Sequence, residues 1–108
     1  MTITLRKRNN QIGISTDLCE ALNIPDTTHV SFERDPNTGE YVINEGSFLN
    51  DGDYKVNKYV NGEYIYYSIS CKELHDRLSE FYGRPYNDRL VIDVEQDSYG
   101  YVLINDIS

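Results

Sequence analysis

The residues best suited to recognition chemistry stand near the start of the chain, where three cations precede three side-chain amides. They are Arg6, Lys7, Arg8, Asn9, Asn10 and Gln11. Arginine and lysine bind phosphate oxygens, whereas the amides of asparagine and glutamine can hydrogen-bond to base edges. This order of residues favours contact with nucleic acid. The alternative is a solvated edge strand whose charges oppose aggregation.

The net charge of the whole chain opposes nonspecific binding to nucleic acid. The 108 residues carry a formal net charge of −8. Residues 1–16 hold three cations and no acid, so the rest, with seven cations and eighteen acids, carry −11. Net charge does not describe charge distribution, however, and an acidic protein can present a cationic surface.

A second group of side chains is typical of a protein-binding surface. Tyr64 and Tyr66 lie in a tyrosine-rich segment, and exposed tyrosines are enriched at protein interfaces. Asp93, Glu95 and Asp97 alternate along "VIDVEQD" and therefore project from one face of a strand. Three interpretations stay open for these acids: an anionic patch with phosphate-like spacing, a weak cation site, or the wet face of an antiparallel strand.

No catalytic or metal-binding constellation stands out. Cys71 and His75 are one helical turn apart, but no second pair completes a four-ligand metal site and no further group completes a nucleophile site. Ser15 and Ser70 are better explained as helix caps. We therefore expect no enzyme activity, no metal and no cofactor. The two cysteines are expected to be reduced, and the lack of a long apolar run or a secretory signal predicts a cytoplasmic protein without membrane contact.

An internal repeat organises these residues. The stretches "GEYVIN" and "GYVLIN" each close a hairpin, which follows a short helix within "STDLCEALNIP" or "SCKELHDRLSEFYGRP". A further hairpin precedes each helix, with predicted turns at Asn9-Asn10 and Asn61-Gly62. The chain is therefore predicted to be mostly β with two short helices (α+β). We expect one domain, 1–108, built from two β-β-α-β-β repeats at 1–44 and 54–105 and a connector at 45–53.

The first repeat resembles a known family. The segment "LRKRNNQIGISTDLCEALNIPDTTHVSFERDPNTGEYVI" is similar to the swapped-hairpin DNA-binding domain of the AbrB and MazE type. In that family two chains interleave their hairpins into one β-barrel, and the two first hairpins face DNA. The resemblance implies that two copies in one chain form such a barrel as an internal pseudo-dimer. The protein would then be a monomeric pseudo-dimer or a homodimer.

The resemblance implies a transcriptional regulator or antitoxin-like module that binds duplex DNA. The residues expected to contact DNA are Arg6, Lys7, Arg8, Asn9, Asn10, Gln11, Lys55 and Lys58. Gln11 stands where family members often carry an arginine, and Glu63 lies in the second turn. These departures favour an alternative, an acidic, DNA-mimic-like inhibitor of phage or mobile-element type that blocks a basic nucleic-acid-handling protein. It would use Tyr64, Tyr66, Asp93, Glu95 and Asp97.

Overall fold

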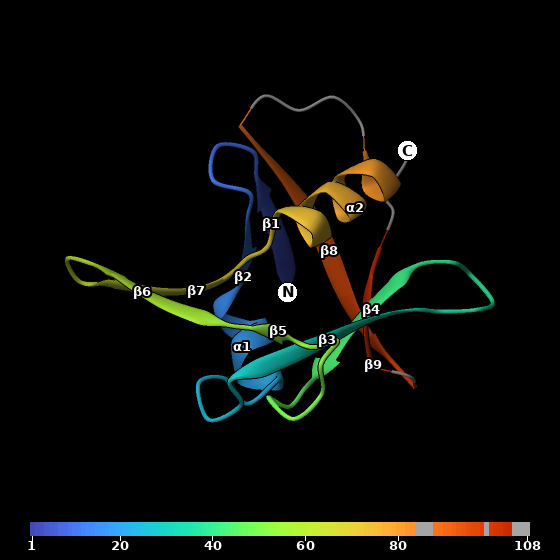
Figure 1. Cartoon of the computed structure of the whole chain (residues 1–108), viewed down its shortest axis with the longest axis horizontal. Helices are drawn as coiled ribbons and strands as arrows, with labels where there is room; N and C mark the ends of the chain where they lie inside the picture. Colours follow the sequence, from blue (N-terminus) through green and yellow to red (C-terminus); the bar gives the residue numbers. More distant parts are fainter. Residues whose placement is uncertain (84–87, 99, 105–108) are drawn as a thin grey trace.

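The computed structural model describes residues 1–83, 88–98 and 100–104, which form nine strands and two short helices (Figure 1). In chain order the elements are β1 (Thr2–Arg6), β2 (Gln11–Ile14), α1 (Thr16–Ala21), β3 (His29–Arg34), β4 (Tyr41–Glu45), β5 (Tyr54–Lys55), β6 (Asn57–Asn61), β7 (Tyr64–Ser70), α2 (Lys72–Tyr82), β8 (Arg89–Asp97) and β9 (Gly100–Leu103). The prediction of a mostly β chain with two short helices is confirmed. Parts of the predicted second repeat, namely 84–87, 99 and 105, lie outside the described residues.

The strands form one antiparallel sheet that nearly closes into a barrel. The order of neighbours is β5-β3-β4-β9-β8-β1-β2-β7-β6. The two outermost strands, β5 and β6, are consecutive in the chain and separated only by Val56. The backbone N–H of this buried residue donates to the carbonyl of Thr28 (2.9 Å). One short segment therefore bridges both edges of the sheet, which reduces the length of exposed edge.

The core lies inside the barrel and follows the alternation of side chains along the strands. In β1, Ile3 and Leu5 are fully buried, whereas Thr4 between them lies on the outer face. The largest fully buried side chains are Ile3, Leu5, Ile12, Leu18, Leu22, Ile43, Ile69, Leu74, Leu78, Leu103, Val30 and Ser68. Since burying one aliphatic side chain of this size contributes about 1.5–3 kcal/mol, both helices and most strands help to stabilise one core.

The helix α2 buries one apolar stripe. Leu74, Leu78 and Tyr82 are spaced four residues apart and are all buried. The hydroxyl of Tyr82 donates to the carbonyl of Leu103 (2.7 Å) and accepts from the backbone N–H of Tyr41 (3.0 Å). These two hydrogen bonds attach the end of α2 to β9 and β4.

The predicted cap of the second helix is wrong. Ser70 is the last residue of β7, and Cys71 occupies the N-cap position without a side-chain capping bond. Pairing with Gln11 keeps Ser70 in the sheet, where its Oγ lies 3.2 Å from the hydroxyl of Tyr59. Ser70 therefore belongs to the sheet, although the local sequence pattern predicted it as the cap of the helix.

The first hairpin turn is longer than predicted. Arg6 pairs with Gln11 across β1 and β2, so the turn comprises residues 7–10 instead of the two asparagines. The backbone N–H of Lys7 donates to the carbonyl of Asp88 (3.0 Å) and therefore does not continue the β1–β2 ladder. The second and third cations of the sequence consequently lie in an exposed turn.

The second hairpin turns one residue later than predicted. Asn61 pairs with Tyr64, which leaves Gly62 and Glu63 as the turn. Gly62 has a φ of 63°, and a positive φ at the first of two turn residues is typical of a type II′ turn, in which glycine is favoured. Figure 1 shows that this β6–β7 hairpin reaches well away from the body of the molecule.

Candidate nucleic-acid interface

Four exposed cations gather at one end of the outer sheet face, and we call them the cation corner. Arg6 lies directly opposite Arg89 on the neighbouring strand β8, while Lys7 and Arg8 follow Arg6 in the turn. Side chains opposite one another on adjacent strands have Cβ atoms about 4.5–5.5 Å apart, and like charges there are destabilising. An anion bound between Arg6 and Arg89 would relieve this repulsion.

The ion pairs of the described residues lie elsewhere. They join the amino group of Met1 to Asp17, Lys72 to Asp76, His75 to Asp76, and Arg77 to Glu73. Within the described ranges, Arg6, Arg8 and Arg89 belong to none of them. The acid nearest in sequence to these arginines is the exposed Asp88, which precedes Arg89. One carboxylate beside four cations leaves the cation corner with a net positive charge. These three arginines are therefore able to bind an external anion.

A shallow groove of about 170 Å³ runs along the outer face beside the cation corner. Its lining residues are Thr2, Thr4, Arg6, Gly13, Ile14, Ser15, Tyr66 and Tyr67. Gly13 in the middle of β2 has no side chain, and the Arg6 Nε lies 4.0 Å from the position that a Cβ on Gly13 would take. The guanidinium therefore turns back over the sheet, and we call this hollow the Gly13 groove.

Ser15, at one end of the groove, is held by its neighbours. It occupies the N-cap position of α1 as predicted, but it makes no side-chain capping bond. Its hydroxyl instead accepts from the backbone N–H of Thr2 (2.9 Å) and donates to Asp17 (2.6 Å). The hydrogen bond from Ser15 first, and then the one from the amino group of Met1, lower the pKa of Asp17 below its ordinary value. The carboxylate is thus charged at neutral pH, and it forms an ion pair with the amino group of Met1 (3.1 Å) near this end of the groove.

Two tyrosines stand on the far side of the Gly13 groove. Tyr66 and Tyr59 face one another across β7 and β6, with ring centroids 5.2 Å apart and an angle of 12° between the rings. We call them the tyrosine pair. Tyr66 lines the groove and is 38% exposed, and Tyr64 on the same face is 79% exposed. The outer face thus combines a cationic end with an aromatic end.

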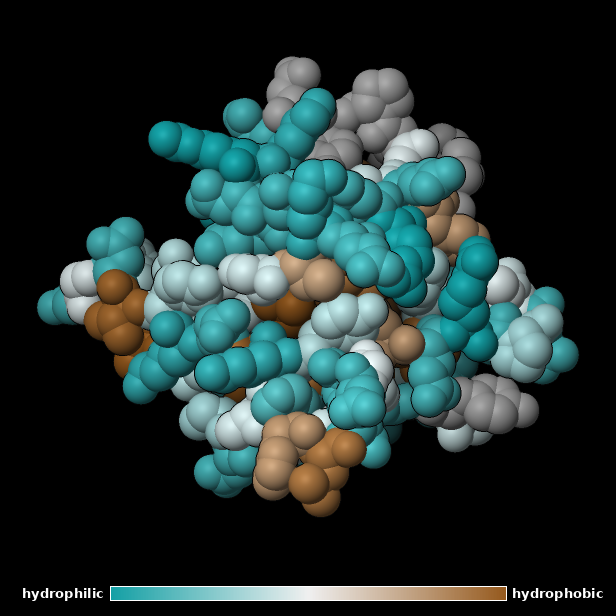
Figure 2. All heavy atoms as spheres, in the orientation of Figure 1, coloured by the Kyte–Doolittle hydropathy of each residue, from teal (hydrophilic) through white to brown (hydrophobic). Residues whose placement is uncertain are grey.

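The opposite face of the β6–β7 hairpin departs from expectation. Alternation predicts that one pair of residues, either Tyr64 and Tyr66 or Ile65 and Tyr67, packs in the core. Tyr67 does pack against it, but Ile65 is 55% exposed and lies opposite Val60, which is 65% exposed. The reason is that β7 pairs with β2 only over residues 67–70, so the hairpin extends past the barrel. Figure 2 shows the resulting apolar surface at the tip of this hairpin.

Lys55 and Lys58 do not join the cation corner. Lys55 in β5 pairs with His29 of β3, on another part of the barrel wall. Lys58 lies opposite Tyr67, which packs toward the core, so its side chain leaves the sheet on the face opposite to that of Arg6. The five cations expected on one face are thus divided, and Arg89 takes the place beside Arg6.

The three acids of β8 lie where the alternation predicts. Asp93, Glu95 and Asp97 are exposed, and Ile92 and Val94, on either side of Asp93, are buried. Glu95 and Asp97 share a second shallow hollow with the carboxylates of Asp35 and Glu40. In the described part of the chain no cluster of three or more such ligands suits a metal ion. The acids therefore form an anionic surface at the end of β8 away from Arg89.

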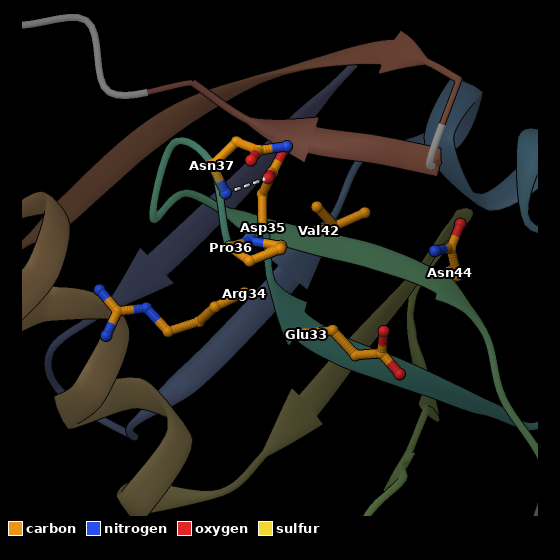
Figure 3. A pocket seen from close by; sticks show the side chains of 7 residues that line it. All are labelled: Glu33, Arg34, Asp35, Pro36, Asn37, Val42 and Asn44. Atoms are coloured by element: carbon orange, nitrogen blue, oxygen red, sulfur yellow. Dashed lines mark hydrogen bonds between the residues drawn. The ribbon is translucent and has the colours of Figure 1, made fainter.

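Figure 3 shows another hollow, next to the turn between β3 and β4. The backbone N–H of Asn37 donates to the carboxylate of Asp35 (2.8 Å), a bond typical of an Asx-turn. Arg34 points away toward α2, where its guanidinium carbon lies 4.7 Å from the centroid of the Phe81 ring. The polar groups of this hollow are thus largely engaged in shaping the hairpin.

The two thiols offer little nucleophilic chemistry. Cys19 is 4% exposed, and its thiol donates a weak hydrogen bond to the carbonyl of Ile14 (3.8 Å). Burial first, and then the neighbouring carboxylates, raise its pKa to about 11. His75 in α2 is buried, and its Nδ1 lies 3.2 Å from the carboxylate Oδ1 of Asp76. Cys71 is half-buried at the start of α2.

No protein-family model, curated protein or solved structure matches this chain. The resemblance to the AbrB and MazE domains therefore stays a prediction. Among the described residues, neither helix is long and apolar enough to cross a membrane.

Proposed function

We propose that this protein binds DNA and that the cation corner holds phosphate groups. The observation that carries the proposal is the pairing of β1 with β8, which sets Arg6 beside Arg89 with no acid between them. A guanidinium forms paired hydrogen bonds with phosphate oxygens, and two adjacent guanidinium groups suit one phosphate or two successive ones. A bound phosphate would offset the repulsion between Arg6 and Arg89, because it attracts both guanidinium groups.

The amides next to the corner would supply contacts with bases. Asn9 and Asn10 lie in the turn between β1 and β2, and Gln11 is the first residue of β2 opposite Arg6. Such amides can donate to and accept from a base edge. A glutamine at this position removes one phosphate contact expected from the family, and Arg89 supplies a cation from the neighbouring strand.

We also infer that the barrel is an internal pseudo-dimer. The first strand of each predicted repeat pairs with the third strand of the other, as β1 does with β8 and β5 does with β3. The equivalent second strands, β2 and β7, pair with one another, and so do the last strands, β4 and β9. This pattern is the one expected for interleaved hairpins, and it supports an AbrB-like regulator or antitoxin module. Light scattering that gives the mass of one chain at micromolar concentration would agree with it, whereas an obligate dimer would contradict it.

The salt dependence of binding tests the phosphate contacts. Fluorescence anisotropy measures the affinity for labelled single-stranded and duplex DNA at salt concentrations from 50 to 200 mM. In a plot of log affinity against log salt concentration, each contacted phosphate contributes a slope of about −0.7 to −0.9. The Arg6→Ala/Arg8→Ala variant should lower the slope by about 2. The control, Lys55→Ala/Lys58→Ala, removes the same charge elsewhere and should keep the slope. Equal losses in both variants, or no binding of either DNA by the wild type at low salt, would refute the proposal.

The anionic surface favours a second candidate, an inhibitor of a basic nucleic-acid-handling protein. Asp93 and Glu95 are exposed on one face of β8, and the hollow that Glu95 lines brings further carboxylates beside it. A surface of this charge attracts basic partners by long-range steering. The candidate predicts that immobilised wild-type protein retains nucleic-acid-handling proteins from a lysate and that Asp93→Asn/Glu95→Gln/Asp97→Asn loses them. Equal recovery with both proteins would argue against it.

A further inference from the structure

We propose that the outer face of β1, β2, β7 and β6 binds single-stranded nucleic acid, with phosphates at the cation corner and bases stacked on the tyrosine pair. This inference rests on the proposed function and names the form of its ligand. The Gly13 groove joins the two ends, because Arg6 and Tyr66 both line it.

The floor of the face is open enough for a base to approach the sheet. The accessible side chains on the outer side of these strands are small or polar near the groove: Thr2, Thr4, Ser15 and Ser70, with Gly13 among them. Ser68, which pairs with Gly13, is buried. Gly13 leaves the backbone uncovered, and the nearest atoms to a Cβ placed there belong to Thr4, at 3.6 and 3.7 Å. A flat ring can therefore lie over β2 between Arg6 and Tyr66.

The tyrosine pair forms a stacking platform. Its two rings are nearly parallel, and Tyr66 rather than Tyr59 lines the groove, so Tyr66 presents its accessible surface to an incoming ring. Tyr64 continues the aromatic surface toward the hairpin tip and is largely exposed. Stacking on an aromatic side chain requires an unpaired base with a free face, which a duplex does not offer. The platform therefore favours a single strand.

The charges along the face set the direction in which the strand lies. Arg89 and Arg6 are cationic at one end, whereas the exposed carboxylate of Asp93 lies opposite Thr2 at the other. Phosphates are attracted to the first end and repelled from the second, where the uncharged bases meet the tyrosines. From the pairings, Arg6 and Tyr66 are two strands and four residues apart, a backbone distance of roughly 16 Å. A short single strand spans this distance.

The test compares a labelled eight-nucleotide oligothymidine with a DNA hairpin whose stem pairs the same eight thymidines with eight adenosines, at low salt. The wild type should bind the single strand at least about tenfold more tightly than the duplex. Tyr66→Ala should weaken single-strand binding about 5- to 150-fold, the range for one base stacked on an aromatic ring. Tyr66→Phe, which restores the ring, should recover most of that loss. Phe48→Ala removes a ring that is 73% exposed in the loop between β4 and β5, and it should not change the affinity.

Gly13→Val tests the groove without endangering the fold. A Cβ at this position meets its neighbours at ordinary contact distances, and valine is favoured in strands, so the unfolding temperature should stay the same or rise. Single-strand affinity should nevertheless fall at least about tenfold, because valine fills the floor and displaces Arg6.

The outcomes separate the two proposals. Duplex binding as tight as single-strand binding, or unchanged affinity in Tyr66→Ala and Gly13→Val, would overturn the single-strand inference and leave DNA binding by the cation corner in place. A wild type that binds neither probe would overturn both.

Discussion

The hydroxyl of Tyr82 is a buried polar group that joins three elements of the fold, and its removal yields a quantitative prediction. It joins α2 to β9 through the carbonyl of Leu103 and to β4 through the N–H of Tyr41, at 2.7 and 3.0 Å. Leu103 is fully buried, and Tyr41 is only 5% exposed. Tyr82→Phe keeps the ring and its packing but leaves two backbone groups without this partner.

The expected loss follows from the energy of unsatisfied groups. A buried donor or acceptor left without a partner destabilises a protein by about 1–3 kcal/mol. Two such groups that share one hydroxyl predict a decrease of about 2–4 kcal/mol in the free energy of unfolding, which corresponds to about 10–20 °C for a domain of this length. Burial raises the pKa of Tyr82 to about 12, so the hydroxyl keeps its proton throughout the neutral range and the prediction does not depend on buffer pH.

Urea unfolding followed by circular dichroism measures this loss. The matched control is Tyr59→Phe, which removes a hydroxyl whose contact with Ser70 (3.2 Å) is exposed to solvent. That variant should lose less than about 0.5 kcal/mol, because water replaces the partner. A Tyr82→Phe protein as stable as the control, with an unchanged m-value, would refute the bridging role of the Tyr82 hydroxyl.

Burial protects Cys19, so a thiol reagent should modify only Cys71 in the folded protein, and two rapidly reacting thiols before unfolding would contradict this. Because the pKa of Cys19 is raised from 9.0 to about 11 in the folded state, its contribution to stability is complete below pH 9 and is lost as the pH rises through 11. Denaturant unfolding at both ends of this window should show a larger loss in the wild type than in Cys19→Ala, which keeps the loss that comes from the raised pKa of Tyr82. Gly46→Ala should destabilise the protein by about 1–3 kcal/mol, since the new methyl would lie 2.6 Å from the Asp53 carboxylate and 2.9 Å from the backbone of β3. Gly52→Ala, which meets no atom within 4 Å, should have little effect in the same thermal-unfolding assay.

Local patterns identified the elements of this fold well. The segment "SCKELHDRLSEFYGRP" predicted α2, and the alternation of acids along "VIDVEQD" predicted β8 with its acids outside. These predictions succeed because side-chain direction depends only on the backbone of the same element.

The ends of the helices and strands were less predictable, because hydrogen bonds to residues distant in sequence also decide where an element begins or ends. Ser70 fits a helix cap by sequence, yet its pairing with Gln11 holds it in β7. The two asparagines fit a short turn, yet the bond from Lys7 to Asp88 lengthens that turn to four residues. In each case a tertiary hydrogen bond outweighs a local preference.

The candidate site shows the same division. The sequence by itself determined that Arg6, Lys7 and Arg8 stand together, that Tyr64 and Tyr66 share one face, and that the chain is mostly β. Only the tertiary structure decided that Arg89 lies beside Arg6, that Lys58 leaves the sheet on the other face, and that Gly13 opens a groove toward Tyr66. Adjacent residues are neighbours in any fold, whereas the pairing of distant strands depends on which arrangement buries the whole apolar core, and no short stretch of sequence carries that information.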